Sequence, residues 1–117
     1  MPTLLVVKIV SKAEWDVAKT KGVYEGSSDD NRDGFIHLSA PNQVKGTAAK
    51  YFAGRDDLLL VSIDSRKLGP ALRWEKSRGG EDFPHLYAPL DLKSVAQVEP
   101  LARSADGAYL FPDWLPD

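Results

Sequence analysis

The chain has 117 residues, of which 43% are hydrophobic and 27% charged, and its net charge is −2 at pH 7. This size and composition predict one domain over residues 1–117 with one hydrophobic core, and they exclude a disordered chain. The balanced charge gives no sign of nucleic-acid binding, and the lack of cysteine excludes disulfides, thiolate nucleophiles and thiolate metal sites.

The sequence shows no pattern of a membrane or export segment. No apolar run approaches the roughly 20 residues that a membrane-spanning helix needs. The run Leu4–Val7 follows no basic region and is broken by Lys8, so we expect a strand there and not a signal peptide. We expect a cytoplasmic protein with no membrane contact, and its oligomeric state stays open.

The first elements are a buried strand and a short helix. Residues 3–10 are mostly aliphatic and β-branched, which predicts a largely buried strand. Ser11 and Glu14 then form a capping-box pattern, in which each side chain satisfies an amide at the start of a helix. Lys21 and Gly22 are typical of the end of that helix.

A polar segment and a second strand follow. Residues 26–34 are rich in Gly, Ser, Asp and Asn, a composition that predicts a loop. Residues 35–39 alternate in polarity, so Phe35, His37 and Ser39 are expected on one face of a short strand.

The middle of the chain predicts one clear helix between two strands. Pro41 is favoured in the first turn of a helix, and a helical stripe of apolar residues continues to Gly54. Residues 58–64 are a second buried strand, and Gly69-Pro70 marks a turn.

The last third of the chain is expected to be strand-rich. Residues 72–76 alternate as in a strand, whereas residues 83–90 contain two prolines, which confines any strand there to an edge or a turn. Residues 95–101 are a candidate last strand, and the aromatic tail 109–115 is expected to pack on the body. Because strands outnumber helices without regular alternation, we predict a compact α+β domain with two or three short helices.

The two histidines are the best candidates for chemistry. His37 and His85 both lie in short apolar segments, after Gly34 and Pro84 respectively. A neutral imidazole donates and accepts hydrogen bonds, and its ordinary pKa lets it act as a general acid, a general base or a ligand anchor. A half-buried histidine that only bonds a backbone carbonyl fits the same segments equally well.

Three neighbouring side chains extend this candidate site. Glu75 lies on the strand face opposite Trp74, and is either the partner of a histidine or a member of a surface ion pair. Trp74 either packs or stacks on a ligand. Tyr87 shares a face with His85 if that segment is extended.

Other catalytic classes lack their patterns. The histidines, with Asp33, Glu75 or Asp82, show no recognised metal-ligand spacing, so no metal is expected. No nucleophile elbow surrounds Ser39, and no glycine loop of the phosphate-binding kind is present.

A set of motifs in fixed order resembles a known family. These are Asp33-Gly34-Phe35-Ile36-His37-Leu38-Ser39, Gln43, Trp74-Glu75 and Phe83-Pro84-His85-Leu86-Tyr87. Together they look like the bacterial domain-of-unknown-function 952 family, over roughly residues 4–98. The resemblance implies a fold similar to the ADP-ribosyltransferase group, in which a split, bent, mostly antiparallel β-sheet forms a cleft that can hold NAD.

The resemblance also implies roles for individual residues. His37 and Ser39 would hold a ribose, and Glu75, His85 or Tyr87 would face them. We expect Gln43 and Trp74, from the same motifs, to contact the ligand. In such chemistry the bond to nicotinamide breaks through an oxocarbenium-like state, which a carboxylate stabilises.

Two classes of function remain open from the sequence. The first is an enzyme or degenerate enzyme that uses NAD, ADP-ribose or a related nucleotide, with His37, Glu75 and His85 as catalytic residues. The second is a non-catalytic binding or interaction domain in which the histidines are structural. A minor alternative is a two-histidine phosphoesterase, although residues 85–87 do not repeat the His-x-Ser pattern of residues 37–39.

Overall fold

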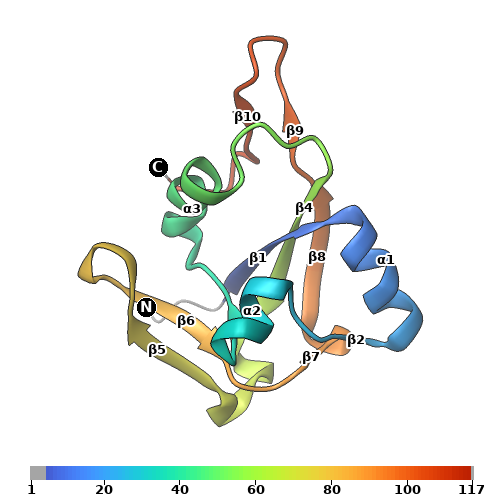
Figure 1. Ribbon diagram of the computed structural model, residues 1–117, viewed down its shortest axis with the longest axis vertical. Helices are drawn as coiled ribbons and strands as arrows, with labels where there is room; N and C mark the ends of the chain where they lie inside the picture. Colours follow the sequence, from blue (N-terminus) through green and yellow to red (C-terminus); the bar gives the residue numbers. More distant parts are fainter. Residues whose placement is uncertain (1–4, 117) are drawn as a thin grey trace.

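The computed structural model describes residues 5–116, apart from the side chain of Arg78 (Figure 1). The α-helices are α1 (Lys12–Lys21), α2 (Ser28–Asp33) and α3 (Val44–Tyr51). The strands are β1 (Leu5–Ser11), β2 (Val23–Tyr24), β3 (Ile36–His37), β4 (Leu58–Asp64), β5 (Leu72–Lys76), β6 (Asp82–Leu86), β7 (Leu90–Asp91), β8 (Val95–Pro100), β9 (Ala102–Arg103) and β10 (Tyr109–Leu110). Short 3₁₀ turns cover Pro41–Gln43, Ser65–Lys67, Gly69–Ala71, Arg78–Gly80 and Leu92–Ser94.

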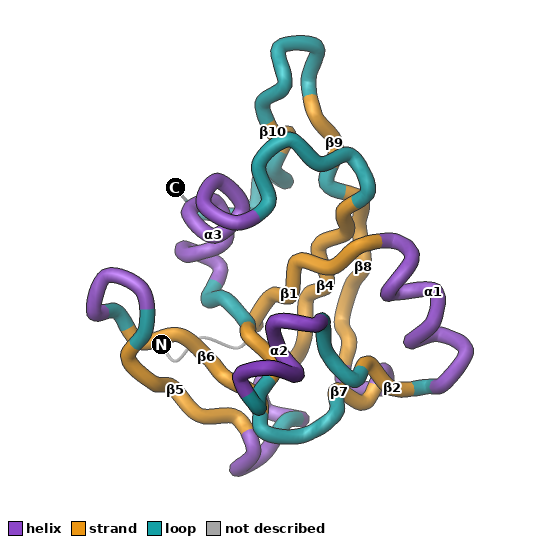
Figure 2. The backbone as a smooth tube through the Cα atoms, in the orientation of Figure 1, coloured by secondary structure: helices purple, strands orange, loops and turns teal. Residues whose placement is uncertain are grey.

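Two three-stranded antiparallel sheets form the body of the molecule. One has the order β1-β4-β8, and the other has the order β3-β6-β5. Figure 2 shows β5 and β6 set apart from the first sheet. The pairs β2-β7 and β9-β10 are also antiparallel. The prediction of an α+β chain with mostly antiparallel strands and few helices is therefore confirmed.

Strands β1 and β4 of the β1-β4-β8 sheet are covered on both faces, as their continuous apolar runs require, whereas β8 is largely exposed. On one face Val6 and Val61 pack with Trp15 of α1 and with residues of the second sheet. On the other face Leu60 packs with Ala48 of α3. Figure 1 shows α1 and α3 on opposite sides of this sheet. The predicted strand over residues 3–10 is confirmed from Leu5, and its first two residues lie outside the described chain.

The first helix begins and ends where the sequence predicts. Ser11 accepts a hydrogen bond from the amide of Glu14 at 3.1 Å, and the carboxylate of Glu14 faces the amide of Ser11 at 3.4 Å. Gly22 ends the helix with φ +82°, a left-handed conformation that suits glycine.

The predicted loop over residues 26–34 is wrong, because it contains the six-residue helix α2. Ser27 and Asp30 form a second capping box, and Gly34 ends the helix with φ +85°. The sequence of this helix has no apolar stripe that would predict it, and its one buried side chain is that of Asp30. It is held instead by its caps and by the buried contacts of Asp30.

The sequence suggested that the prolines of residues 83–90 confine any strand there to an edge or a turn, and this prediction is wrong. Strand β6 is the central strand of its sheet and contains Pro84, paired with Trp74 of β5. The carbonyl of Pro84 still accepts a hydrogen bond from the amide of Leu38 at 3.0 Å. Pro84 is tolerated because it lies where the pairing with the two-residue strand β3 ends, so only one donor is lost.

In the described chain, one isolated bridge joins the backbones of the two sheets. Val7 of β1 and Ser39 exchange two backbone hydrogen bonds, of 2.8 and 2.9 Å. The predicted strand over residues 35–39 is thus shortened to Ile36–His37, followed by this bridge. The bridge brings β3 beside β1, which sets the position of His37 relative to the larger sheet.

The aromatic tail packs on the body, as predicted. Leu115 is buried in the cluster with α3, and Tyr109 and Phe111 pack against the same cluster. The hydroxyl of Tyr109 lies within hydrogen-bond distance of the carbonyls of Phe52 and Arg55. Among residues 5–116, no helix has the length and apolar character needed to span a bilayer.

The capping box of α2 predicts a measurable loss of stability in Ser27→Ala. This variant removes the acceptor for the amide of Asp30 and should lower the free energy of unfolding by about 1 kcal/mol. Chemical denaturation measures the change. Ser28→Ala is the matched control, because Ser28 is exposed at the next position and should change stability by less than about 0.5 kcal/mol. Equal losses in the two variants would contradict the capping role.

Candidate functional site

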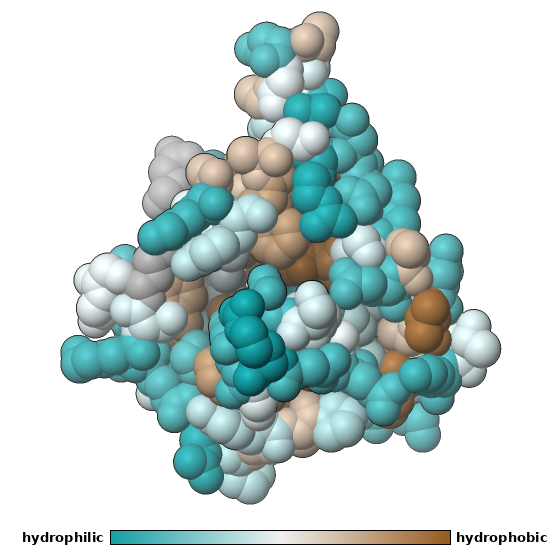
Figure 3. Space-filling view, in the orientation of Figure 1, coloured by the Kyte–Doolittle hydropathy of each residue, from teal (hydrophilic) through white to brown (hydrophobic). Residues whose placement is uncertain are grey.

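A cleft of about 280 Å³ lies among α2, α3, β1 and the second sheet. Its polar side comes from α2 and the two histidines, and its apolar side includes Val7, Ile9, Leu38 and Phe52. In Figure 3 the hydrophilic surface of α2 stands in front of a hollow with a hydrophobic floor. The cleft can therefore receive a ligand with one polar and one apolar part.

Strand register brings the two histidines together in this cleft. His37 of β3 is the direct partner of His85 of β6 in an antiparallel pair. Partners in such a pair project from the same face of the sheet. The two ring centroids are 5.8 Å apart, and both side chains line the cleft. The sequence left open whether they meet, and the structure places them side by side.

Asp30 is the buried centre of the polar side. Lys8 of β1 approaches its two carboxylate oxygens at 3.1 and 2.9 Å, and the amide of Ser27 donates to it at 2.9 Å. The backbone amide of His37 donates to the same carboxylate at 3.0 Å. Burial alone raises the pKa of Asp30, but the His37 side chain, the Lys8 charge and the backbone amides outweigh it. The pKa of Asp30 is therefore held well below its ordinary value, and the carboxylate is ionised.

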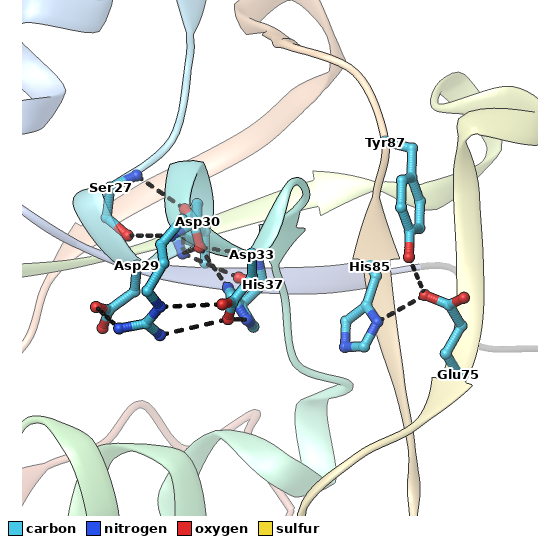
Figure 4. Close-up of polar contacts among 10 residues, drawn as sticks. Ser27, Asp29, Asp30, Asp33, His37, Glu75, His85 and Tyr87 are labelled. Carbon is cyan, nitrogen blue, oxygen red and sulfur yellow. Dashed lines mark hydrogen bonds and ion pairs between the residues drawn. The ribbon is translucent and has the colours of Figure 1, made fainter.

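The ring of His37 lies between two carboxylates (Figure 4). Its Nδ1 is 2.6 Å from Asp30 and its Nε2 is 2.9 Å from Asp33. The guanidinium of Arg32 lowers the pKa of Asp33. Since carboxylates only accept hydrogen bonds, both contacts are satisfied together when both ring nitrogens carry protons.

His85 lines the cleft and has its own carboxylate partner in Glu75 of β5, which lies with Tyr87 outside the lining of the cleft. Its Nδ1 is 2.8 Å from Oε1 of Glu75, and the hydroxyl of Tyr87 donates to the same oxygen at 2.6 Å (Figure 4). The hydroxyl of Tyr87 and the ring of His85 lower the pKa of Glu75. The bond to Glu75 raises the pKa of Tyr87. These three predicted site residues therefore form one connected group.

Phe35 packs among the rings of the site. Its ring is stacked on His85 with centroids 4.1 Å apart, and it lies 4.6 Å from the ring of His37 and 5.3 Å from that of Tyr87. The sequence placed Phe35 on the face of His37 but gave it no role. Its position restricts the rotation of both imidazoles.

The remaining predicted ligand contacts lie in different places. Ser39 lines the cleft and its hydroxyl is 3.1 Å from that of Thr47 on α3. Gln43 does not line the cleft, because its side chain bonds the amide of Ala40 and the carbonyl of Asp82, both at 2.9 Å. Trp74 is 43% exposed on the strand face opposite Glu75 and does not line the cleft either. Gln43 thus connects the start of α3 to β6.

Sequence reasoning missed the Lys8–Asp30 pair and the role of Asp33. One signal was available, because a lone lysine in a buried strand requires a carboxylate partner. The Ser27-x-x-Asp30 capping pattern was a second signal. In residues 5–116, no group of three or more His, Asp or Glu side chains is arranged to hold a metal ion.

Comparisons with known proteins give one family and one set of solved structures. Residues 9–98 match a family described as "Protein of unknown function (DUF952)". The X-ray structure of protein CC0527 from Caulobacter crescentus is 50% identical, with a TM-score of 0.86, and the match covers 91% of this chain and 93% of that chain. Its solution NMR structure is 51% identical, with a TM-score of 0.80 and coverages of 89% and 90%. No curated protein matches the chain significantly.

Replacing Asp30 should be among the most destabilising single changes in the polar side of the cleft. Asp30→Asn leaves the buried ammonium of Lys8 without its counter-charge, so we expect a loss of about 3–5 kcal/mol in the free energy of unfolding at pH 7. Asp29→Asn is the matched control, since Asp29 is exposed and pairs with the exposed Arg32, and should cost about 1 kcal/mol or less. Similar losses in the two variants would show that the buried pair does not stabilise the fold.

The difference in stability between wild type and Asp30→Asn has a defined pH dependence. The folded pKa of Asp30 is lower than the unfolded value of about 3.9. Its ionised form therefore stabilises the fold fully above the unfolded value, and this contribution is lost as the pH falls through the folded value. The difference between wild type and Asp30→Asn in urea denaturation should be fully present at about pH 5 and shrink below about pH 4. A difference that grows below about pH 4 would contradict the assignment.

Proposed function

Since the chain belongs to the DUF952 family of proteins of unknown function, we propose that its cleft binds a ribose-containing nucleotide of the NAD or ADP-ribose type. In this proposal the two histidines line the part of the cleft that receives the ribose, and one of them exchanges a proton with a ribose hydroxyl. The observation that carries this proposal is the direct pairing of the two histidines on β3 and β6, each against its own carboxylate, in one cleft.

The chemistry of the cleft supports a ribose and a base. Imidazole, carboxylate and hydroxyl groups bond ribose hydroxyls as donors and acceptors, and Ser39 adds a hydroxyl beside them. The apolar side, with Ile9 and Phe52, suits a flat base. The volume of about 280 Å³ is at the small end for ligand sites, so the cleft holds part of a dinucleotide.

The motifs that the chain shares with the family support the same ligand class. Their resemblance implied an ADP-ribosyltransferase-like fold, in which a split sheet encloses NAD. Two three-stranded sheets that meet at one bridge, with a cleft beside it, are compatible with that fold. We therefore place the chain with that group as part of the proposal, and assign proton exchange rather than ribosyl transfer to the site.

One observation favours a second candidate, the hydrolysis of a cyclic phosphodiester. Two imidazoles that face one cleft 5.8 Å apart can act as acid and base on the two sides of a phosphate. His37 and Ser39 also carry the first half of the two-histidine pattern. In this candidate the ligand is a cyclic nucleotide, which a binding experiment separates from NAD.

The proposal predicts a localised response to nucleotides. In two-dimensional NMR titrations of the labelled protein with NAD, ADP-ribose and a cyclic nucleotide, the largest shifts from NAD or ADP-ribose should fall at residues 35–39 and 83–87. His85→Ala should weaken binding about tenfold, which corresponds to the loss of about one charge-assisted hydrogen bond. Lys19→Ala, on the exposed side of α1, is the control and should bind as wild type does.

Other results would reject the proposal. Shifts from the cyclic nucleotide alone would favour the phosphodiester candidate. No shift with any nucleotide at millimolar concentration would favour a non-catalytic interaction domain.

A further inference from the structure

We propose that the two histidines have unequal roles, with His85 exchanging a proton with the ligand through Nε2 while His37 stays fixed. Glu75 and Tyr87 are positioning residues that hold the ring of His85 with its proton on Nδ1. The inference deepens the proposed function and rests on it for the ligand. The protonated nitrogen of His85, however, is a property of the protein without ligand.

His37 has no ring nitrogen left for a ligand. Nδ1 is bonded to Asp30 and Nε2 to Asp33, at 2.6 and 2.9 Å. Asp30 is buried and is also bonded to Lys8, so it cannot turn away without leaving that lysine unpaired. His37 is therefore suited to orient a ligand and to carry charge, and not to pass a proton.

His85 offers one nitrogen to the cleft. Its Nδ1 faces Glu75 at 2.8 Å, and none of the described residues bonds its Nε2. A carboxylate only accepts hydrogen bonds, so Nδ1 must carry the proton in this contact. In a neutral ring Nε2 is then an acceptor. Because His85 is buried but lines the cleft, this acceptor faces the space where a ligand would lie.

Tyr87 completes the support of this arrangement. Its hydroxyl donates to the same Oε1 of Glu75 at 2.6 Å, which fixes the carboxylate in place. The bonds from Tyr87 and His85 lower the pKa of Glu75, so the carboxylate stays ionised at neutral pH. Phe35 stacks on the imidazole, and the guanidinium of Arg73 lies 5.2 Å from the centre of the Tyr87 ring. The ring of His85 is thus held from its Nδ1 side and across one face.

The proton step balances without any other reactant. A ligand hydroxyl gives its proton to Nε2 of His85 and keeps the electron pair as an oxyanion, while Nδ1 keeps its own proton and its bond to Glu75. The imidazolium that forms is stabilised by the negative charge of Glu75. The reverse step returns the proton to the ligand.

The test is to locate the proton on His85 in the unliganded protein. Two-dimensional ¹H–¹⁵N NMR of the imidazole nitrogens, at a pH where the ring is neutral, should show wild-type His85 with its proton on Nδ1. Glu75→Gln keeps the shape of the side chain but weakens the acceptor, so His85 should move toward the Nε2–H form that free histidine favours. Tyr87→Phe should cause a smaller change in the same direction. Glu25→Gln, which removes an exposed charge paired with Lys21, is the control and should change nothing.

The wild-type spectrum alone is able to overturn the inference. A proton on Nε2 of wild-type His85 would do so, even if Glu75→Gln fails to fold. An unchanged proton position in a folded Glu75→Gln would also do so, because Glu75 would then not set it. A proton on Nδ1 together with no nucleotide binding would reject the proposed function and leave the positioning role of Glu75 supported.

Discussion

The buried ion pair between Lys8 and Asp30 is the interaction on which the cleft depends. A lysine inside a strand that is covered on both faces needs a carboxylate, since an unpaired buried ammonium costs several kcal/mol. Asp30 supplies it, and the same carboxylate then binds the backbone and the ring of His37. Lys8 also donates to the carbonyl of His37 at 3.0 Å. The Lys8–Asp30 pair therefore joins β1, α2 and β3. It neutralises the buried charge of Lys8 and fixes the position of His37.

Local signals predicted the regular elements of the fold well. Helix α1 has a capping box and an apolar face, and the continuous apolar residues of β1 and β4 match a sheet that is buried on both sides. Helix α2 has neither length nor an apolar face, and Asp30 is stabilised by Lys8, 22 residues earlier in the chain. Such a partner cannot be read from neighbouring residues. The central position of Pro84 is equally non-local, because it depends on where β3 ends.

The candidate site could be predicted only in part, because some of its features are local in the sequence and others join distant residues. The segment of His37 could be recognised as a short strand, that of His85 only as an edge strand or a turn, and Glu75 could be named as a possible partner of a histidine. That His37 and His85 meet depends on the register of strands 48 residues apart (85 − 37). Gln43 is a further non-local case, since its side chain bonds the carbonyl of Asp82, 39 residues later in the chain. Its side chain connects the start of α3 to β6 and does not line the cleft.

The bridge between Val7 and Ser39 also has a consequence for motion. Its two hydrogen bonds are the backbone link between the two three-stranded sheets in the described chain. A local opening that parts the sheets breaks these two bonds and the contacts of Lys8 with Asp30 and His37, but leaves the ladders within each sheet intact. The amides of Val7 and Ser39 would then exchange their hydrogens with solvent at each opening, while the amides inside β4 stay protected. Their exchange rates therefore report how often the cleft widens.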